Sequence, residues 1–209
     1  MFGLDRTEMA RIRKAGTVLL LSVPMLTFVM SGHAVAHTEG GVVGGFISGL
    51  SHPVSGWDHV VAMIAVGLWG AFLGAPAIWL LPIVFPLIMA FGGVLGILGV
   101  PIPSIEVGIS LSAIVLGLCV AFALRPPLYI AAVIVGAFAI FHGHAHGTEL
   151  PTAANAFAFA AGFVIATGLL HVAGIAFGLL ARWDVGRIAV RACGGLIALA
   201  GVVFLSGVA

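Results

Sequence analysis

Two short clusters of histidine and acidic residues interrupt an otherwise apolar chain. The first lies in the segment Ser51–His59, and the second lies in the segment Phe141–Glu149. Their candidate ligands are His52, Asp58 and His59 in the first segment, and His142, His144, His146 and Glu149 in the second. Imidazoles and carboxylates are costly beside hydrocarbon and are typical ligands of divalent transition metals. We therefore expect the two clusters to meet in space and to bind such an ion.

The types of ligand narrow the choice of metal. Imidazole nitrogens combined with carboxylate oxygens suit nickel, cobalt or zinc, whereas copper(I) prefers thiolates. Three acidic side chains, Asp58, Glu106 and Glu149, are available to offset the charge of a dication in a low-dielectric setting. The two cysteines, Cys119 and Cys193, fall within apolar runs and are interpreted as buried thiols.

The first cluster is predicted to lie at a broken helix. Pro53 disfavours helical geometry at His52, and Gly56 loosens the next turn. We expect His52 to precede the break, and Asp58 with His59 to begin the first membrane span. Broken helices around a cavity are a common way for transporters to bind ions. As an alternative role, Asp58 could cap the helix N-terminus.

The second cluster is compatible with two backbone conformations. In a helix, His142, His146 and Glu149 would form one stripe and His144 would point elsewhere. In an extended segment the three histidines would instead share a face. Gly143 and Gly147 leave both conformations open. Three histidines within five residues beside a glutamate favour a metal site in either case.

Composition identifies the class of protein. Hydrophobic residues make up 62% of the 209 residues, charged residues only 7%, and the mean hydropathy is +1.27. So few charges cannot cover a water-soluble domain of this length, and the long apolar runs are typical of membrane-spanning helices. The predicted fold is an all-α, polytopic membrane bundle that contacts the lipid bilayer. No basic patch with aromatic residues suggests a nucleic-acid partner.

The N-terminal segment 1–36 resembles a secretory signal peptide. A positive region with arginines is followed by the apolar run Ala15–Met30 and by Ala34-Val35-Ala36, an A-x-A cleavage site. Cleavage would make His37 the new N-terminus, with an imidazole and an amine available to a metal. Two alternatives remain open: an uncleaved anchor for the segment, and a solvent-exposed, unliganded side chain for His37.

Residues 37–209 are predicted to form a single transmembrane domain with about six spans. Residues 41–50 are too short and glycine-rich to cross a bilayer and predict a short or re-entrant segment. The expected spans are residues 57–73, 77–99, 105–124, 128–141, 152–180, and from the arginine-rich loop after Arg182 to the C-terminus.

Charge predicts the orientation of these spans. Arg125 lies between the third and fourth spans, and Arg182, Arg187 and Arg191 lie around the loop before the last one. Positive loops stay cytoplasmic, so alternating spans would place the mature N-terminus outside. Both histidine clusters and Glu106 then lie at the outer face. An exported signal peptide requires the same orientation.

The two clusters also resemble a known family. The first reads His52-Pro53-x-x-Gly56-x-Asp58-His59, followed by Met63 and Val66-Gly67, and the second reads Phe141-His142-Gly143-x-Ala145-His146-Gly147-x-Glu149. Both motifs, in this order, resemble the signatures of the HupE/UreJ family, and the similarity covers the whole mature chain.

The resemblance implies a nickel permease of the bacterial inner membrane that supplies hydrogenase or urease, with cobalt as the ion for some relatives. It assigns the metal path to six side chains, namely His52, Asp58, His59, His142, His146 and Glu149. Glu106 and His144 lie outside the matched positions, and Glu106 is added because acidic residues at a span's outer end are commonly functional. The metal is a transported substrate, no resident cofactor is expected, and a homo-oligomer is compatible with the sequence.

Two rival functions use the same residues. Three histidines and an aspartate could hold a catalytic zinc with an open position for water, and Glu149 could act as a base, which would make an intramembrane hydrolase. A metal sensor would need a domain to carry its signal, and the sequence suggests none. The preferred hypothesis is a non-enzymatic facilitator. No Walker-type loop is present, so ATP hydrolysis within this chain is excluded as its driver.

Overall fold

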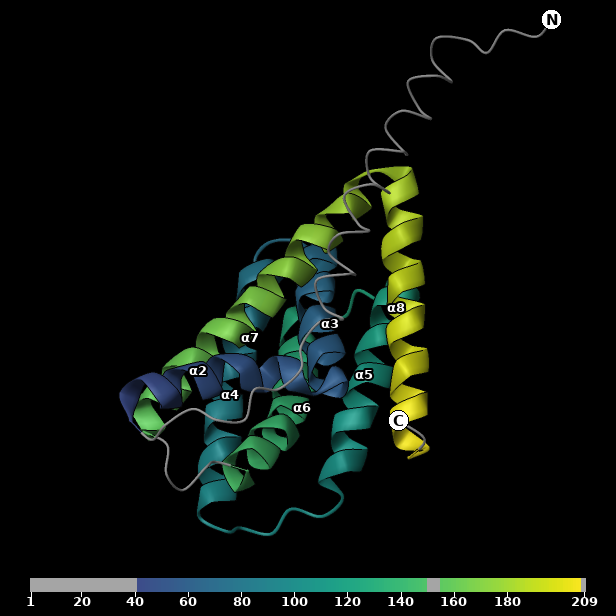
Figure 1. The fold of residues 1–209 in the computed structure, drawn as a ribbon. Coiled ribbons are helices and arrows are strands. Elements are labelled where there is room, and N and C mark those ends of the chain that lie inside the picture. The colour runs from purple at the N-terminus through teal and green to yellow at the C-terminus, as the bar shows by residue number, and fades with distance from the viewer. Residues whose placement is uncertain (1–40, 150–154, 208–209) are drawn as a thin grey trace, which may run out of the picture. The chain divides into compact units, whose positions relative to one another are not determined.

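The computed structural model describes residues 41–149 and 155–207, and the regular structure of these residues is helical (Figure 1). The predicted signal peptide and His37 lie outside the described residues. The elements in chain order are α2 (Val42–Ser55), α3 (Trp57–Leu73), α4 (Ala77–Ile97), α5 (Ile105–Ala121), α6 (Leu128–Thr148), α7 (Ala156–Gly178), the short 3₁₀ helix η2 (Leu179–Arg182) and α8 (Asp184–Leu205).

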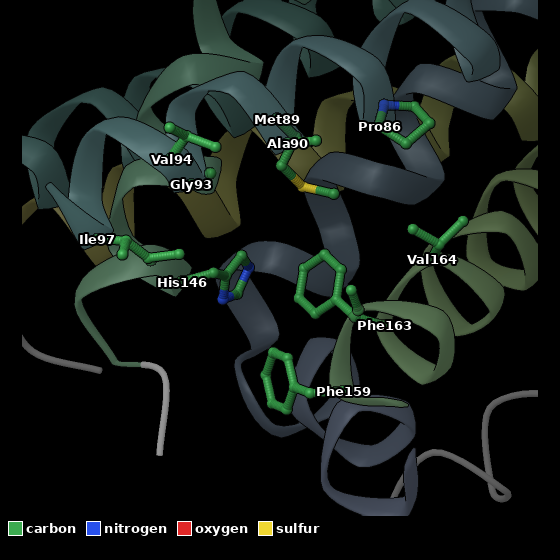
Figure 2. Close-up of a pocket in the computed structure, with 13 residues that line it drawn as sticks. Pro86, Met89, Ala90, Gly93, Val94, Ile97, His146, Phe159, Phe163 and Val164 are labelled. Carbon is green, nitrogen blue, oxygen red and sulfur yellow. The ribbon is translucent and has the colours of Figure 1, made fainter. Parts of the chain in front are cut away.

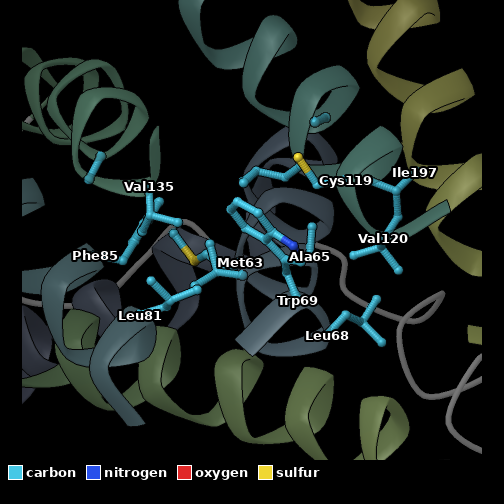
Figure 3. Packing of buried hydrophobic residues seen from close by; sticks show 14 of the residues in the cluster. Met63, Ala65, Leu68, Trp69, Leu81, Phe85, Cys119, Val120, Val135 and Ile197 are labelled. Atoms are coloured by element: carbon cyan, nitrogen blue, oxygen red, sulfur yellow. The ribbon is translucent and has the colours of Figure 1, made fainter. Parts of the chain in front are cut away.

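Helix α3 forms the centre of the bundle. It contacts α4, α5, α7 and α8, and from Val60 to Gly70 nearly every residue is buried. A helix that is apolar on all sides is stable only when other helices surround it. Met63 and Trp69 are fully buried and pack with Leu81, Phe85 and residues of the other neighbouring helices in one core (Figure 3).

The surrounding helices each expose a large apolar face. Trp79, Leu87 and Phe91 on α4 are more than half exposed, and so are Leu196 and Leu199 on α8. A water-soluble protein rarely shows such continuous apolar surface, whereas lipid favours it. Together with helix length, this identifies a multi-pass membrane protein.

Four helical segments are long and apolar enough to cross a membrane on their own: α4, α6, α7 with η2, and α8. Helices α2 and α3 satisfy the same test only as a pair, and they bend by 82° at the break between them. Helix α5, with 17 residues, is shorter. The described residues thus support four spans, or five with the bent pair, and the predicted total of about six stays a prediction.

Close helix packing depends on glycines. A side chain added at Gly143 or Gly147 of α6 would overlap the backbone of Met89 or Gly93 on α4. On the central helix, a Cβ at Gly67 would lie 3.0 Å from Cα of Gly174 on α7. Small residues at such crossings let backbones approach, and the resulting van der Waals contacts hold membrane helices together.

The arginines and the histidine clusters occupy opposite ends of the bundle. Arg125 lies over the ring of Phe72, 4.9 Å from its centroid, and Arg191 donates a 2.7 Å hydrogen bond to the Ala121 carbonyl. The first contact joins the segment after α5 to the C-terminal end of α3, and the second joins the beginning of α8 to the C-terminal end of α5. The histidines lie at the start of α3 and the end of α6, a helix of 21 residues or roughly 30 Å.

Two predictions about local structure were wrong in detail. His52 precedes a helix break, and Asp58 with His59 begins the next helix, as expected, but His52 is itself helical, because α2 continues through Pro53 to Ser55 and the break falls at Gly56. A proline's fixed φ fits a helix, and the single lost hydrogen bond falls in the last turns, while α2 packs along α7. The fourth span was predicted to end at Phe141, but α6 extends to Thr148. The helical alternative for the second cluster is therefore the correct one.

Candidate metal centre

The bend at Gly56 brings the two histidines of the first cluster to one site. His52 lies in the last turn of α2, and His59 lies in the first turn of α3. Gly56 has an extended backbone, and a Cβ there would lie 2.7 Å from Asp58 Oδ1 and 3.1 Å from His59 Nδ1. The absence of a side chain at this position therefore leaves room for the Asp58–His59 pair.

The last turns of α6 supply the second cluster. His142 and His146 are one turn apart, and both are buried toward the bundle interior. His144 points elsewhere, as expected for a helix, and its Nε2 donates a 2.7 Å hydrogen bond to the Val100 carbonyl in the loop between α4 and α5. This bond joins the loop to the end of α6 that carries the cluster.

Four imidazoles from three helices form a row. The ring centroids of His52 and His146 are 4.8 Å apart, those of His146 and His59 are 4.4 Å apart, and those of His59 and His142 are 4.8 Å apart. We call these four residues the histidine row. The predicted meeting of the two clusters is thus observed, although residues of α2, α3 and α6 are up to about ninety positions apart.

A carboxylate lies beside each of two members of the row. Asp58 Oδ1 is 2.8 Å from Nδ1 of His59 and also accepts a hydrogen bond from the His59 backbone N–H. Glu149 Oε2 is 3.4 Å from Nε2 of His52. Ligand atoms of His52, His146 and Glu149 all lie within 4.8 Å of one another, close enough to share one metal ion.

Hydrogen bonds determine which ring nitrogens of His59 and His142 have a lone pair that could bind an ion. The Ser112 hydroxyl donates to the Ile109 carbonyl at 2.6 Å, so it accepts from Nε2–H of His142 at 2.9 Å. Nδ1 of His142 is then the lone-pair nitrogen. By the same reasoning the Asp58 carboxylate accepts from Nδ1–H of His59, which leaves its Nε2 as the lone-pair nitrogen.

These two nitrogens have no hydrogen-bond partner among the described residues, and neither ring nitrogen of His146 has one. All four atoms are buried, and in His146 one nitrogen carries the ring proton while the other offers the lone pair. Buried polar atoms without partners cost free energy and are rare, so each needs an explanation. An ion bound by the row would supply the missing partner. Imidazole and carboxylate ligands fit a first-row divalent metal.

The other predicted site residues are placed differently. Glu106 lies exposed in the first turn of α5 and, like Asp58, His59 and His142, is outside the group of His52, His146 and Glu149 whose ligand atoms could share one ion. Nε2 of His144 is already hydrogen-bonded to the Val100 carbonyl. His37 lies outside the described residues. The metal-binding role of every predicted residue stays a prediction.

Sequence reasoning missed several neighbours of the row. Ser112 contacts His142, while Phe159 and Phe163 of α7 contact the rings of His52 and His146 at centroid distances of 5.5 and 4.5 Å. A serine or phenylalanine in an apolar helix carries no signal of its own. Only the spacing of four residues between Phe159 and Phe163, which places them on one helical face, could have drawn attention.

A pocket of about 210 Å³ lies beside His146 between α4, α6 and α7 (Figure 2). Across the pocket, α7 residues Phe159, Phe163 and Val164 face Met89 and other residues of α4. His146 is the polar side chain among the described residues that line it. At His146, the histidine row therefore borders a pocket with an otherwise apolar lining.

Comparisons with known proteins agree with these features. A family model described as "HupE / UreJ protein" matches residues 25–204. A curated relative, "Protein HupE" of Rhizobium leguminosarum bv. viciae, is 47% identical over 175 residues, which cover 83% of this chain and 92% of the relative. No solved structure matches the chain. The match over most of its length, together with the histidine motifs, shows that the chain belongs to the HupE/UreJ family.

Proposed function

We propose that this protein is a permease that takes up nickel ions, with cobalt as the alternative substrate, through the histidine row. The observation that carries the proposal is the convergence of four imidazoles and two carboxylates at one end of an apolar bundle. Several of their buried nitrogens have no partner among the described residues. Membership of the HupE/UreJ family, for which the sequence motifs imply such a permease, supports the same function.

The proposed orientation follows the charges. Positive loops stay in the cytoplasm, so the end with Arg125 and Arg191 faces inward and the histidine row faces the periplasm. The protein would then lie in the bacterial inner membrane with its mature N-terminus outside. Nickel would pass from the periplasm to the cytoplasm, where hydrogenase or urease requires it.

The membrane potential is a sufficient driving force. Two positive charges moving inward across an inside-negative potential gain about 4–5 kcal/mol per 100 mV, since each gains about 2.3 kcal/mol. Imidazoles with two nearby carboxylates among the described residues suit an ion that must also leave, because conduction requires binding strong enough to enter and weak enough to release.

A hydrolase is the less favoured function. Glu149 is 3.4 Å from His52, and its side chain is 60% exposed, so it is not held in a dry site where a general base would act. Among the described residues, the adjacent pocket offers His146 as its polar group.

The direct test is Ni²⁺ influx into proteoliposomes with an imposed inside-negative potential, with Co²⁺ and Zn²⁺ as competitors. Influx should saturate, and His59→Ala and Glu149→Gln should reduce it. Asp184→Asn is the matched control, because it also removes a carboxylate charge but lies at the arginine end. Uptake equal to that of empty liposomes, combined with one tightly retained zinc per protein, would overturn the proposal.

A further inference from the structure

Helix α7 carries two buried polar side chains that the proposed site does not use. Thr167 and His171 are 0% and 1% exposed. The Thr167 hydroxyl and both ring nitrogens of His171 have no hydrogen-bond partner among the described residues. The two residues are one turn apart and therefore lie on the same face of α7.

A third polar group lies beside them. Pro86 has no N–H, so the carbonyl of Pro82, one turn earlier in α4, lacks its usual helical donor. The ring of His171 lies beside this carbonyl without forming a regular hydrogen bond. An imidazole, a hydroxyl and a backbone carbonyl are thus available together inside the bundle, where each is costly to leave unpaired.

This polar group lies next to the histidine row on its inner side. The ring of Phe85 separates the two, with its centroid 5.5 Å from that of His142 and 5.4 Å from that of His171. Along α7, His171 is twelve residues beyond Phe159, which contacts His52 at the mouth. At 1.5 Å per residue this is roughly 18 Å further into the bundle.

We propose that His171 and Thr167, with the Pro82 carbonyl, form an inner binding site for the transported divalent cation. The inference rests on the proposed permease function and extends it. The cation would leave the histidine row at His142, pass Phe85 as that ring rotates, and bind at His171. The inner ligands are all neutral, so they hold a dication more weakly than the row with its carboxylates and favour release toward the arginine end.

The test compares Ni²⁺ influx into proteoliposomes with equilibrium Ni²⁺ binding to the same purified proteins. His171→Phe keeps a planar ring but removes both nitrogens, and Thr167→Val replaces the hydroxyl by a methyl. Leu169→Phe is the control, because it adds a phenyl ring at a lipid-exposed position of the same helix. His171→Phe should lower maximal influx about tenfold or more, with equilibrium binding at the row unchanged. Thr167→Val should give a smaller loss, and Leu169→Phe none.

Each outcome decides the inference. Normal influx by His171→Phe would overturn the inner site and leave the permease intact, since a packing role needs no nitrogen. If wild-type liposomes took up no more than empty ones, the permease and the inner site would fall together. If His171→Phe failed to fold, Thr167→Val would decide: reduced influx with normal binding supports the inner site, and wild-type influx refutes it. A folded His171→Phe that lost binding as well would show that the two sites are not separate.

Discussion

At the scale of single residues, the partners of the histidines matter as much as the histidines. Asp58 and Ser112 fix which ring nitrogen of His59 and His142 carries the proton, and in the proposed site they would influence the ion through these rings. Outer partners of this kind orient the ligands of metal sites and raise their basicity. Position 112 could not be selected from the sequence, since its effect depends on the packing of α5 against α6.

Ser112 provides a test of this orienting role. Ser112→Ala should weaken Ni²⁺ binding to the purified protein about tenfold. The reason is that His142 loses the acceptor of its Nε2–H, which keeps the proton off Nδ1 and leaves the Nδ1 lone pair free to bind the ion. Isothermal titration calorimetry would measure the change. Ser110→Ala is the control, since Ser110 is also a buried serine of α5, whereas the hydrogen bond to His142 is made by Ser112. Unchanged affinity in Ser112→Ala would show that His142 is not a ligand or needs no orientation.

His144 and His146 form a matched pair within one helical turn. His146→Ala should lower Ni²⁺ affinity by about 10–100-fold, because its ring packs between those of His52 and His59 and no hydrogen bond among the described residues occupies its nitrogens. His144→Ala should retain most of the affinity, because its nitrogen is bonded to Val100. Metal binding measured by equilibrium dialysis would compare the two variants. Equal losses in both would place His144 among the ligands.

At the scale of elements, the sequence predicted most helices and the meeting of the two clusters. Long apolar runs separated by proline, glycine and arginine located them. It did not predict that α2 continues through Pro53 or that α6 extends past Phe141 to Thr148. Local propensity disfavours helix at both places, but packing of α2 along α7 and of α6 along α4 outweighs it. Such contacts are not visible in one sequence.

The α4–α6 crossing predicts a stability difference between two glycine substitutions. Gly143→Ala should destabilise the protein by about 1–3 kcal/mol, because the new methyl overlaps the Met89 backbone. Gly93→Ala on the facing helix should be tolerated, since its methyl would lie 3.5 Å from the Gly143 carbonyl oxygen, an ordinary contact. Thermal unfolding in detergent would compare them. A Gly143→Ala protein as stable as wild type would contradict the close crossing.

At the scale of the whole molecule, the bundle has two chemically different ends. The described arginines gather at one end, and the histidine row lies at the other. This separation could be predicted from the sequence, because alternating spans carry successive loops to alternate sides. The shape of the row could not, since it depends on the 82° bend and on side-chain packing.

Membrane orientation gives a whole-molecule prediction. In a variant whose native cysteines are replaced by alanine, Ser104→Cys should react with an impermeant thiol reagent added to intact cells. Asp184→Cys should react only after permeabilisation, because Asp184 lies with the arginines at the end that we propose to be cytoplasmic. Both positions are exposed, so burial does not explain a difference. The opposite labelling pattern would mean that the row faces the cytoplasm.

The two faces of α6 have a consequence for how metal preference can change. Gly143 and Gly147 face α4 and hold the helices together, whereas His142 and His146 face the interior. Substitutions that exchange one ligand type for another at 142 or 146 therefore leave the helix pairing in place. For the proposed permease, we therefore expect ion selectivity and folding to be separable traits in this segment. A library that varies the two histidine positions and fixes the glycines should yield folded permeases with altered selectivity.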